Sequence, residues 1–134
     1  MKLKLAAAAL ALAALVTPVS AQDATGTWLT QSGETRVRIA PCGGNVCGTI
    51  VWVKNTGAKD ENNPNAAQKS RSLVGVNMIN MKSSGDKKWA GTLYNPQDGK
   101  TYSGTLTQVD ANTLSLSGCV AAVFCRSQNW TRAN

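Results

Sequence analysis

From residue 25 onward, apolar and polar residues alternate along the chain, with almost no helical periodicity. Alternation of this kind is typical of strands that have one face on a core and the other in water. Within 35–40, for example, Val37 and Ile39 share one face while Arg36 and Arg38 share the other. The pattern predicts eight strands, over residues 25–31, 35–40, 48–54, 76–81, 88–94, 101–109, 113–120 and 124–132.

Most segments between these strands are short and rich in turn-forming residues. The stretches QSGE (31–34), SSGDK (83–87), NPQDGK (95–100) and VDANT (109–113) supply the Gly, Asn, Asp and Pro residues that tight hairpins need. A meander of eight strands either closes on itself or leaves exposed edges. We therefore expect an all-β fold, an antiparallel up-and-down β-barrel of about eight strands.

One connection is much longer than the others. Residues 55–72, NTGAKDENNPNAAQKSRS, are polar and lack a strand pattern, and the Asn-Pro pair at 63–64 could start a short helical turn through 66–68. Asp60 and Asn62 resemble part of a calcium loop, but its glycine and distal glutamate are missing. We expect a flap that caps one end of the barrel, because long loops are often lids or ordered flaps.

The first 21 residues have the features of a secretory signal peptide. Lys2 and Lys4 precede an apolar run over 5–16, and small residues lead up to Ala21 as at a cleavage site. The apolar run is too short to span a bilayer. We expect cleavage after Ala21, one mature domain over 22–134, no membrane span, and a periplasmic or secreted location.

The mature chain is basic. Without Lys2 and Lys4, the 14 basic residues become 12, against 7 acidic residues, so its net charge is +5. The basic residues are scattered, which indicates a solvated surface. In an exported protein this charge suits anionic envelope surfaces or solubility, and we expect no nucleic-acid partner.

Four cysteines in an exported chain predict disulfides, for which three connectivities are possible. Cys42 and Cys47 flank a four-residue hairpin loop, and Cys119 and Cys125 flank five residues in the same manner. This local spacing favours the bridges 42–47 and 119–125 over crossed pairings. A zinc site is the alternative, but the chain has no histidine and no C-x-x-C pair.

Tryptophan at the very start of the first strand needs a partner, because an exposed tryptophan is unfavourable. Closing the barrel requires the last strand to meet the first. The last strand places Arg126, Gln128, Trp130 and Arg132 on one alternating face, so that an arginine there can stack on Trp28. We expect Gly26, Trp28, Trp130 and Arg132 to close the barrel, an arrangement similar to that of lipocalins and their calycin relatives.

A closer resemblance extends over the mature chain. The stretches GTWLTQSGETRVRIAPCGG, VCGTIVWVK, DENNPN, RSLVGV, KWAGTLYNPQDGKTYSGTLT and CRSQNWTR resemble the bacterial secreted domain-of-unknown-function family numbered 2147. The resemblance implies a lipocalin-like barrel and no defined catalytic residues. The matching positions are Gly26, Trp28, Cys47, Gly48, Arg71, Gly75, Trp89, Gly91, Tyr94, Pro96, Gly99, Tyr102 and Trp130.

The chain offers little for catalysis. It has no histidine, which removes the usual general base, and its seven carboxylates all fall at the N-terminus, in turns or in the flap. We therefore expect no enzymatic activity, no cofactor and no metal.

A barrel of this size can enclose one small apolar or amphipathic molecule. The candidate lining is Val37, Ile39, Ile50, Trp52, Trp89, Leu93, Tyr102, Leu106, Leu114 and Leu116, although the same residues can simply form a filled core. We expect Trp52, Trp89, Leu93, Tyr102 and Leu106 to contact the ligand. Arg71 at the mouth could hold its head group, or could merely bond loop carbonyls.

The alternative function is a protein-interaction module of the cell envelope, acting through its surface and the 55–72 flap. Protease inhibition by an extended N-terminal arm is a special case of this role. Only residues 22–25 would precede the first strand after cleavage, which is short for reaching a protease cleft.

Overall fold

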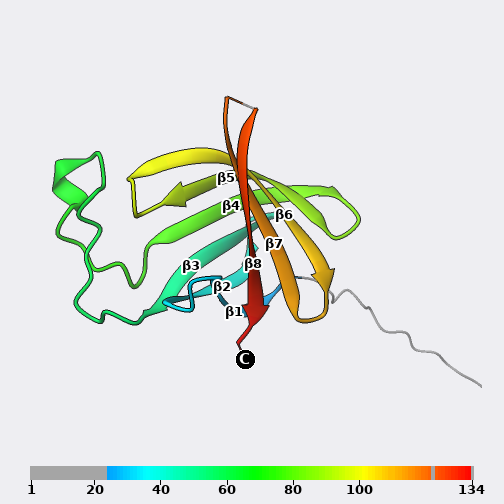
Figure 1. The fold of residues 1–134 in the computed structure, drawn as a ribbon, viewed down its shortest axis with the longest axis horizontal. Coiled ribbons are helices and arrows are strands. Elements are labelled where there is room, and N and C mark those ends of the chain that lie inside the picture. Colours follow the sequence, from blue (N-terminus) through cyan, green and yellow to red (C-terminus); the bar gives the residue numbers. More distant parts are fainter. Residues whose placement is uncertain (1–23, 122, 134) are drawn as a thin grey trace, which may run out of the picture.

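The computed structural model describes residues 24–121 and 123–133, which form a closed barrel of eight antiparallel strands in chain order (Figure 1). The predicted signal peptide and its cleavage site lie outside these residues. The strands are β1 (Gly26–Leu29), β2 (Thr35–Cys42), β3 (Asn45–Val53), β4 (Asn77–Gly85), β5 (Lys88–Asn95), β6 (Lys100–Asp110), β7 (Thr113–Val120) and β8 (Phe124–Arg132).

The long connection between β3 and β4 stands out to one side of the barrel (Figure 1). It contains a single turn of 3₁₀ helix, Ala66–Gln68, where the sequence predicts a helical turn. The Asn65 side chain caps this turn by accepting a hydrogen bond from the backbone N–H of Ala67, at 3.0 Å. We call residues 55–72 the flap.

The first and last strands close the barrel at the end opposite the flap. Trp28 lies directly across from Arg132, whose guanidinium stacks over the indole ring at 4.3 Å from its centroid. Arg132 also donates hydrogen bonds to the carbonyls of Ala111 and Thr25, and the Trp28 indole N–H donates to the carbonyl of Ala24. The closed barrel and the pairing of β1 with β8 agree with the sequence prediction.

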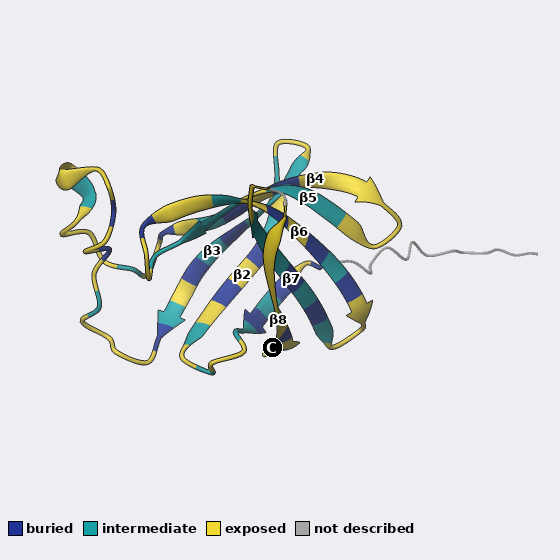
Figure 2. Ribbon diagram, turned by 45° about the horizontal axis from the view of Figure 1, so that its top comes forward, coloured by how far each residue is buried: buried dark blue, intermediate teal, exposed yellow. Residues whose placement is uncertain are grey.

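Buried residues alternate with more exposed ones along β2, β6 and β7 (Figure 2), and the buried residues make up the core of the barrel. They form two groups. The larger one fills the end closed by Trp28, and consists of Ala24, Trp28, Val37, Ile39, Ile79, Met81, Leu106, Leu114, Leu116 and Trp130. The smaller one lies toward the flap and consists of Ile50, Val53 and Val76, with Leu73, Met78, Ala58 and Tyr94 packed on it.

Trp52 differs from the sequence prediction. A β-bulge in β3 leaves Val51 without a partner, because Arg36 pairs with Trp52 while the next residue, Val37, pairs with Ile50. The extra residue reverses the alternation, so Trp52 lies on the outer face with Arg36 stacked 4.6 Å from its ring centroid. Ile50 and Trp52 therefore do not share a face.

Both local disulfides are present. Cys119 and Cys125 are directly opposite each other in β7 and β8, with Cα atoms 4.0 Å apart. Cys42 and Cys47 join diagonally across β2 and β3, 5.8 Å apart, because a tight two-residue turn at Gly43 and Gly44 starts β3 earlier than predicted. The Cys42 bridge therefore lies at the Trp28 end of the barrel and the Cys119 bridge at the flap end.

Candidate functional site: a cavity under the flap

A cavity of about 640 Å³ occupies the flap end of the barrel. Inward positions of several strands contribute apolar side chains to its inner wall. The apolar lining residues are Ile50, Val53, Ala58, Leu73, Met78, Leu93, Pro96, Leu116 and Trp130, with Tyr102 beside them. The rest of the barrel interior, toward Trp28, is filled by the larger core group, two members of which, Leu116 and Trp130, also line the cavity.

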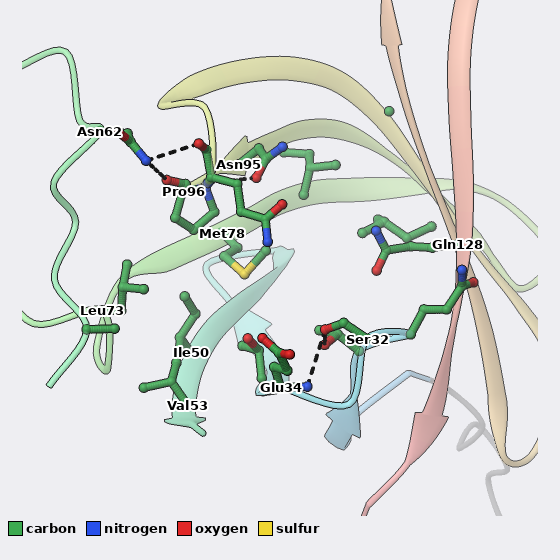
Figure 3. Close-up of a pocket in the computed structure, with 18 of the residues that line it drawn as sticks. Ser32, Glu34, Ile50, Val53, Asn62, Leu73, Met78, Asn95, Pro96 and Gln128 are labelled. Carbon is green, nitrogen blue, oxygen red and sulfur yellow. Dashed lines mark hydrogen bonds between the residues drawn. The ribbon is translucent and has the colours of Figure 1, made fainter. Parts of the chain in front are cut away.

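Loops from three parts of the chain form the polar rim of this cavity. Ser32 and Glu34 come from the β1–β2 turn, Lys59 and Glu61 from the flap, and Gln97 from the β5–β6 turn. Figure 3 shows Ile50, Val53 and Met78 on one side of the cavity and Gln128 projecting from β8 across it. The cavity thus combines an apolar interior with a polar mouth, as in sites that bind small molecules.

The flap is fastened to the turn between β5 and β6. The side-chain amide of Asn62 donates hydrogen bonds to the carbonyls of Pro96, at 3.2 Å, and Gln97, at 3.0 Å (Figure 3). Gly99 makes this contact possible, because a Cβ atom at that position would lie 1.8 Å from the carbonyl oxygen of Asn62. The mouth of the cavity is therefore bounded by two loops that are bonded to each other.

A buried carboxylate organises the flap from within. Asp60 is fully buried, and its Oδ2 accepts hydrogen bonds from Asn63, at 2.8 Å, and from Arg71 Nε, at 2.9 Å. A second Arg71 nitrogen lies 2.9 Å from the same oxygen, and the Tyr94 hydroxyl donates to Asp60 Oδ1 at 2.6 Å. Since Tyr94 belongs to β5, this cluster ties the flap to the barrel wall.

The cluster perturbs both of its acidic groups. Burial raises the pKa of the Asp60 carboxyl, but hydrogen bonds from Tyr94, Asn63 and Arg71, together with the Arg71 charge, outweigh burial and hold that pKa below its ordinary value. Burial, the hydrogen bond to Asp60 and the Asp60 charge raise the pKa of Tyr94 to about 12. Asp60 is therefore an ionised anchor at neutral pH.

Arg71 lies in this cluster and not among the residues that line the cavity. Its guanidinium is occupied by Asp60, so the expected role of holding a ligand's head group gives way to a role in fastening the flap. The partner of Arg71 is the buried carboxylate of Asp60 and not a loop carbonyl, which was the alternative.

The remaining predicted ligand residues divide into two sets. Leu93 and Tyr102 line the cavity, and their contact with a ligand stays a prediction. Trp52 lies outside the barrel because of the β-bulge, and Leu106 is fully buried in the filled half. Trp89 is half-buried against the larger core group and does not line the cavity.

Sequence reasoning missed the contribution of β8 to the cavity. Arg126, Gln128 and Trp130 all line it, and their alternation along the strand was the signal that could have identified them. The Trp130 indole N–H donates to the Gln128 side-chain oxygen at 2.6 Å, which fixes the orientation of that amide.

Tyr102, on β6, also faces this part of the cavity. Its hydroxyl donates to the Asp98 carboxylate, and this hydrogen bond, with a smaller effect of burial, raises the pKa of Tyr102. The positive charge of Arg126 acts on Tyr102 in the opposite direction, as expected of two groups that face the same space. Tyr102 is therefore protonated at neutral pH.

The described residues offer neither a metal site nor a membrane-spanning helix. Within 24–121 and 123–133 there is no group of three or more His, Cys, Asp or Glu side chains that could hold a metal ion. None of the helical segments in those ranges has the length and apolar character needed to cross a membrane.

The chain is similar to proteins that are already known, both in fold and in sequence. Its fold matches the structure of HP1028 from Helicobacter pylori, described as a member of the lipocalin family, with a TM-score of 0.72, 23% sequence identity and 82% of each chain covered. No curated protein matches by sequence. A family model described as an uncharacterized protein conserved in bacteria (DUF2147) matches residues 26–132. The chain belongs to the DUF2147 family, and its domain is a lipocalin-like β-barrel.

Proposed function

We propose that this protein binds a small apolar or amphipathic molecule inside its barrel, outside the cytoplasm. The observation that supports this function most directly is the cavity of about 640 Å³, which falls within the size range of known small-molecule sites. A barrel whose interior served only as a core would be packed along its whole length, as this one is around Trp28.

The two disulfides support the proposed location, because such bridges persist in oxidising compartments. The predicted signal peptide over 1–21 would deliver the domain to the periplasm or the medium.

We infer a binding role and not catalysis from the chemistry of the ionisable groups. The chain lacks histidine, and the buried carboxylate, Asp60, is saturated by Asn63, Arg71 and Tyr94. A general base needs a free lone pair facing its substrate, and the two carboxylates that line the cavity, Glu34 and Glu61, are exposed to solvent at its rim.

Two neighbouring residues of β8 provide a matched test. Gln128 lines the cavity, whereas Ser127 is exposed and does not line it. Gln128→Trp should fill part of the cavity and weaken binding of a medium-chain alcohol, such as decan-1-ol, by about tenfold or more, because the tail loses the apolar surface it would bury. Ser127→Trp should leave binding unchanged. Isothermal titration calorimetry measures both.

The same titration can reject the proposal. Absence of saturable binding of decan-1-ol to the unaltered protein, or equal weakening by the two tryptophan substitutions, would contradict a site in the barrel. Thermal unfolding of each variant shows whether it keeps its fold.

The alternative role, binding another envelope protein through the surface, stays a prediction. It is best supported by the tip of the β7–β8 hairpin, where Val123 is 73% and Phe124 75% exposed. If the tip served this role, Val123→Ser with Phe124→Ser would abolish partner binding and leave decan-1-ol binding intact.

A further inference from the structure

Two cationic residues of the described ranges line the cavity: Lys59 comes from the flap, and Arg126, which is exposed, comes from the strand β8. Arg126 shares one face of β8 with Gln128 and Trp130, and all three line the cavity. Its partner across the strand pair is Gly118, which has no side chain and also lines the cavity. No side chain of β7 therefore covers the guanidinium at this register position.

Three of the other four arginines in the barrel and flap have partners, and the fourth, Arg38, is exposed on the outer face of β2. Arg71 is paired with Asp60, Arg36 stacks on Trp52, and Arg132 bonds two carbonyls and stacks on Trp28. The guanidinium of Arg126 makes no salt bridge or hydrogen bond with any residue in 24–121 or 123–133. A cation on the wall of a cavity that has an apolar interior gains most from a ligand of opposite charge.

Gln128 supplies a second donor beside it. Its side-chain oxygen is taken by the Trp130 indole N–H, so its amide nitrogen remains to donate a hydrogen bond toward the cavity. Of the nearby carboxylates, Asp98 is engaged by the Tyr102 hydroxyl, and Glu34 and Glu61 lie on the rim on the β1–β2 turn and the flap. Arg126 and Gln128 thus present N–H donors from one strand face to whatever occupies the mouth.

We propose that the ligand is an amphiphile with an anionic oxyanion head group, such as a carboxylate or phosphate, which Arg126 and Gln128 bind at the mouth. The apolar tail then extends between Ile50, Leu93 and Leu116. Arg126 takes the role that the sequence suggested for Arg71. This assignment rests on the proposed function, since it needs the cavity to hold a ligand.

The test compares three probes with the same tail and different heads: decanoate, decan-1-ol and decylamine. At neutral pH and low salt, decanoate should bind about tenfold or more tightly than decan-1-ol, and decylamine more weakly than both. Arg126→Gln should remove the preference for decanoate, so that decanoate binds this variant no more tightly than decan-1-ol does. At about 1 M salt the preference of the unaltered protein should shrink, because the Debye length falls to about 3 Å.

Arg38→Gln is the matched control, because Arg38 is exposed on the outer face of β2 and its loss removes the same charge from the protein. It should keep the preference for decanoate. Equal affinities for the three probes, or a preference that survives Arg126→Gln, would overturn the role of Arg126 while the barrel site itself stands. Failure of decan-1-ol to bind would overturn the site and this assignment together.

Discussion

Trp28 shows how one residue near the start of the domain stabilises its closure. Its side chain is fully buried, its indole N–H is bonded to the carbonyl of Ala24, and Arg132 covers its ring. The interaction joins the first strand to the last, so it contributes to the whole barrel and not to one hairpin.

Trp28→Ala should lower the free energy of unfolding by about 3–5 kcal/mol, as removal of a buried aromatic side chain usually does. Trp52→Ala is the control, because Trp52 also lies under an arginine but is half-buried on the outer face. Trp52→Ala should lower the free energy of unfolding clearly less than Trp28→Ala does. Denaturant unfolding compares the two, and equal losses, or a loss below about 1 kcal/mol for Trp28→Ala, would refute the closure role.

The lowered pKa of Asp60 predicts that the stability of the protein depends on pH. Because its pKa is lowered in the folded state, its contribution is fully present above the unfolded value near 3.8 and is lost as the pH falls through the folded value. Asp60→Asn should therefore cost about 1–3 kcal/mol at neutral pH, and the cost should shrink below about pH 3.8. Urea unfolding at several pH values measures it.

Asp86→Asn serves as the control for this experiment, since Asp86 is exposed in the β4–β5 turn. It should change stability little at any pH. A difference between the unaltered protein and Asp60→Asn that stays constant from neutral pH to well below pH 3.8 would show that Asp60 does not act through its charge.

Single residues are also where sequence reasoning reached its limit. Alternation assigned Trp52 to the interior, but one bulged residue reversed the faces, and nothing in VWVK marks a bulge. Arg71 was assigned to the mouth because it ends a polar loop. Its true partner, Asp60, is buried only once the flap has folded, and no local pattern encodes that burial.

The flap behaves as an ordered element although it has little regular secondary structure. An isolated antiparallel β-bridge between Lys59 and Ser72 joins the two ends of the flap, and hydrogen bonds from Asn62 join the flap to the β5–β6 turn. We expect this contact to control access to the cavity, because residues on both sides of it form the rim.

Gly99→Ala tests this contact. The added Cβ atom would collide with the Asn62 carbonyl, so the flap should detach and trypsin should cleave after Lys59 or Lys69 several-fold faster. Gly33→Ala is a close control, since Gly33 has a similar φ of +78° against +72° but no atom within 4 Å of its added Cβ. It should suffer only the strain of the left-handed backbone, about 1–2 kcal/mol. Equal cleavage rates in both variants would exclude the contact as the anchor.

At the level of elements, the sequence was informative because the barrel is built from local hairpins. The predicted bounds of β7 and β8 coincide with those observed, since alternation there runs unbroken between clear turns. The observed bounds of β3 and β4 differ from the predicted ones, because the ends of these strands depend on pairing with neighbouring strands. The Gly43–Gly44 turn, for example, lets Asn45 pair with Cys42.

The whole molecule has a filled half and a hollow half, which the sequence could not distinguish. Leu106 and Leu114 lie in the filled half, whereas Leu93 and Leu116 reach the cavity, and all four are the same residue type on inward strand positions. Whether inward side chains meet depends on the curvature of the barrel and on where loops cover its end.

If the predicted signal peptide directs export, it should be cleaved off during export. Produced in a bacterium from its own start codon, the protein should be recovered from the periplasm or medium with the mass of residues 22–134 and both disulfides formed. Mass spectrometry under non-reducing conditions measures this. Ala21→Arg, which replaces the small residue at the cleavage site, should leave the leader attached. A protein that keeps residues 1–21 without that substitution would contradict export by cleavage.

Methyl NMR during titration with decan-1-ol shows whether a molecule binds inside the barrel. We expect saturable shifts at the methyl groups of Ile50, Leu93 and Leu116, which line the cavity. The methyl groups of Val51 and Val109, both exposed, should not shift. Saturable shifts confined to exposed valines, or no saturable shift in the cavity, would contradict binding inside the barrel.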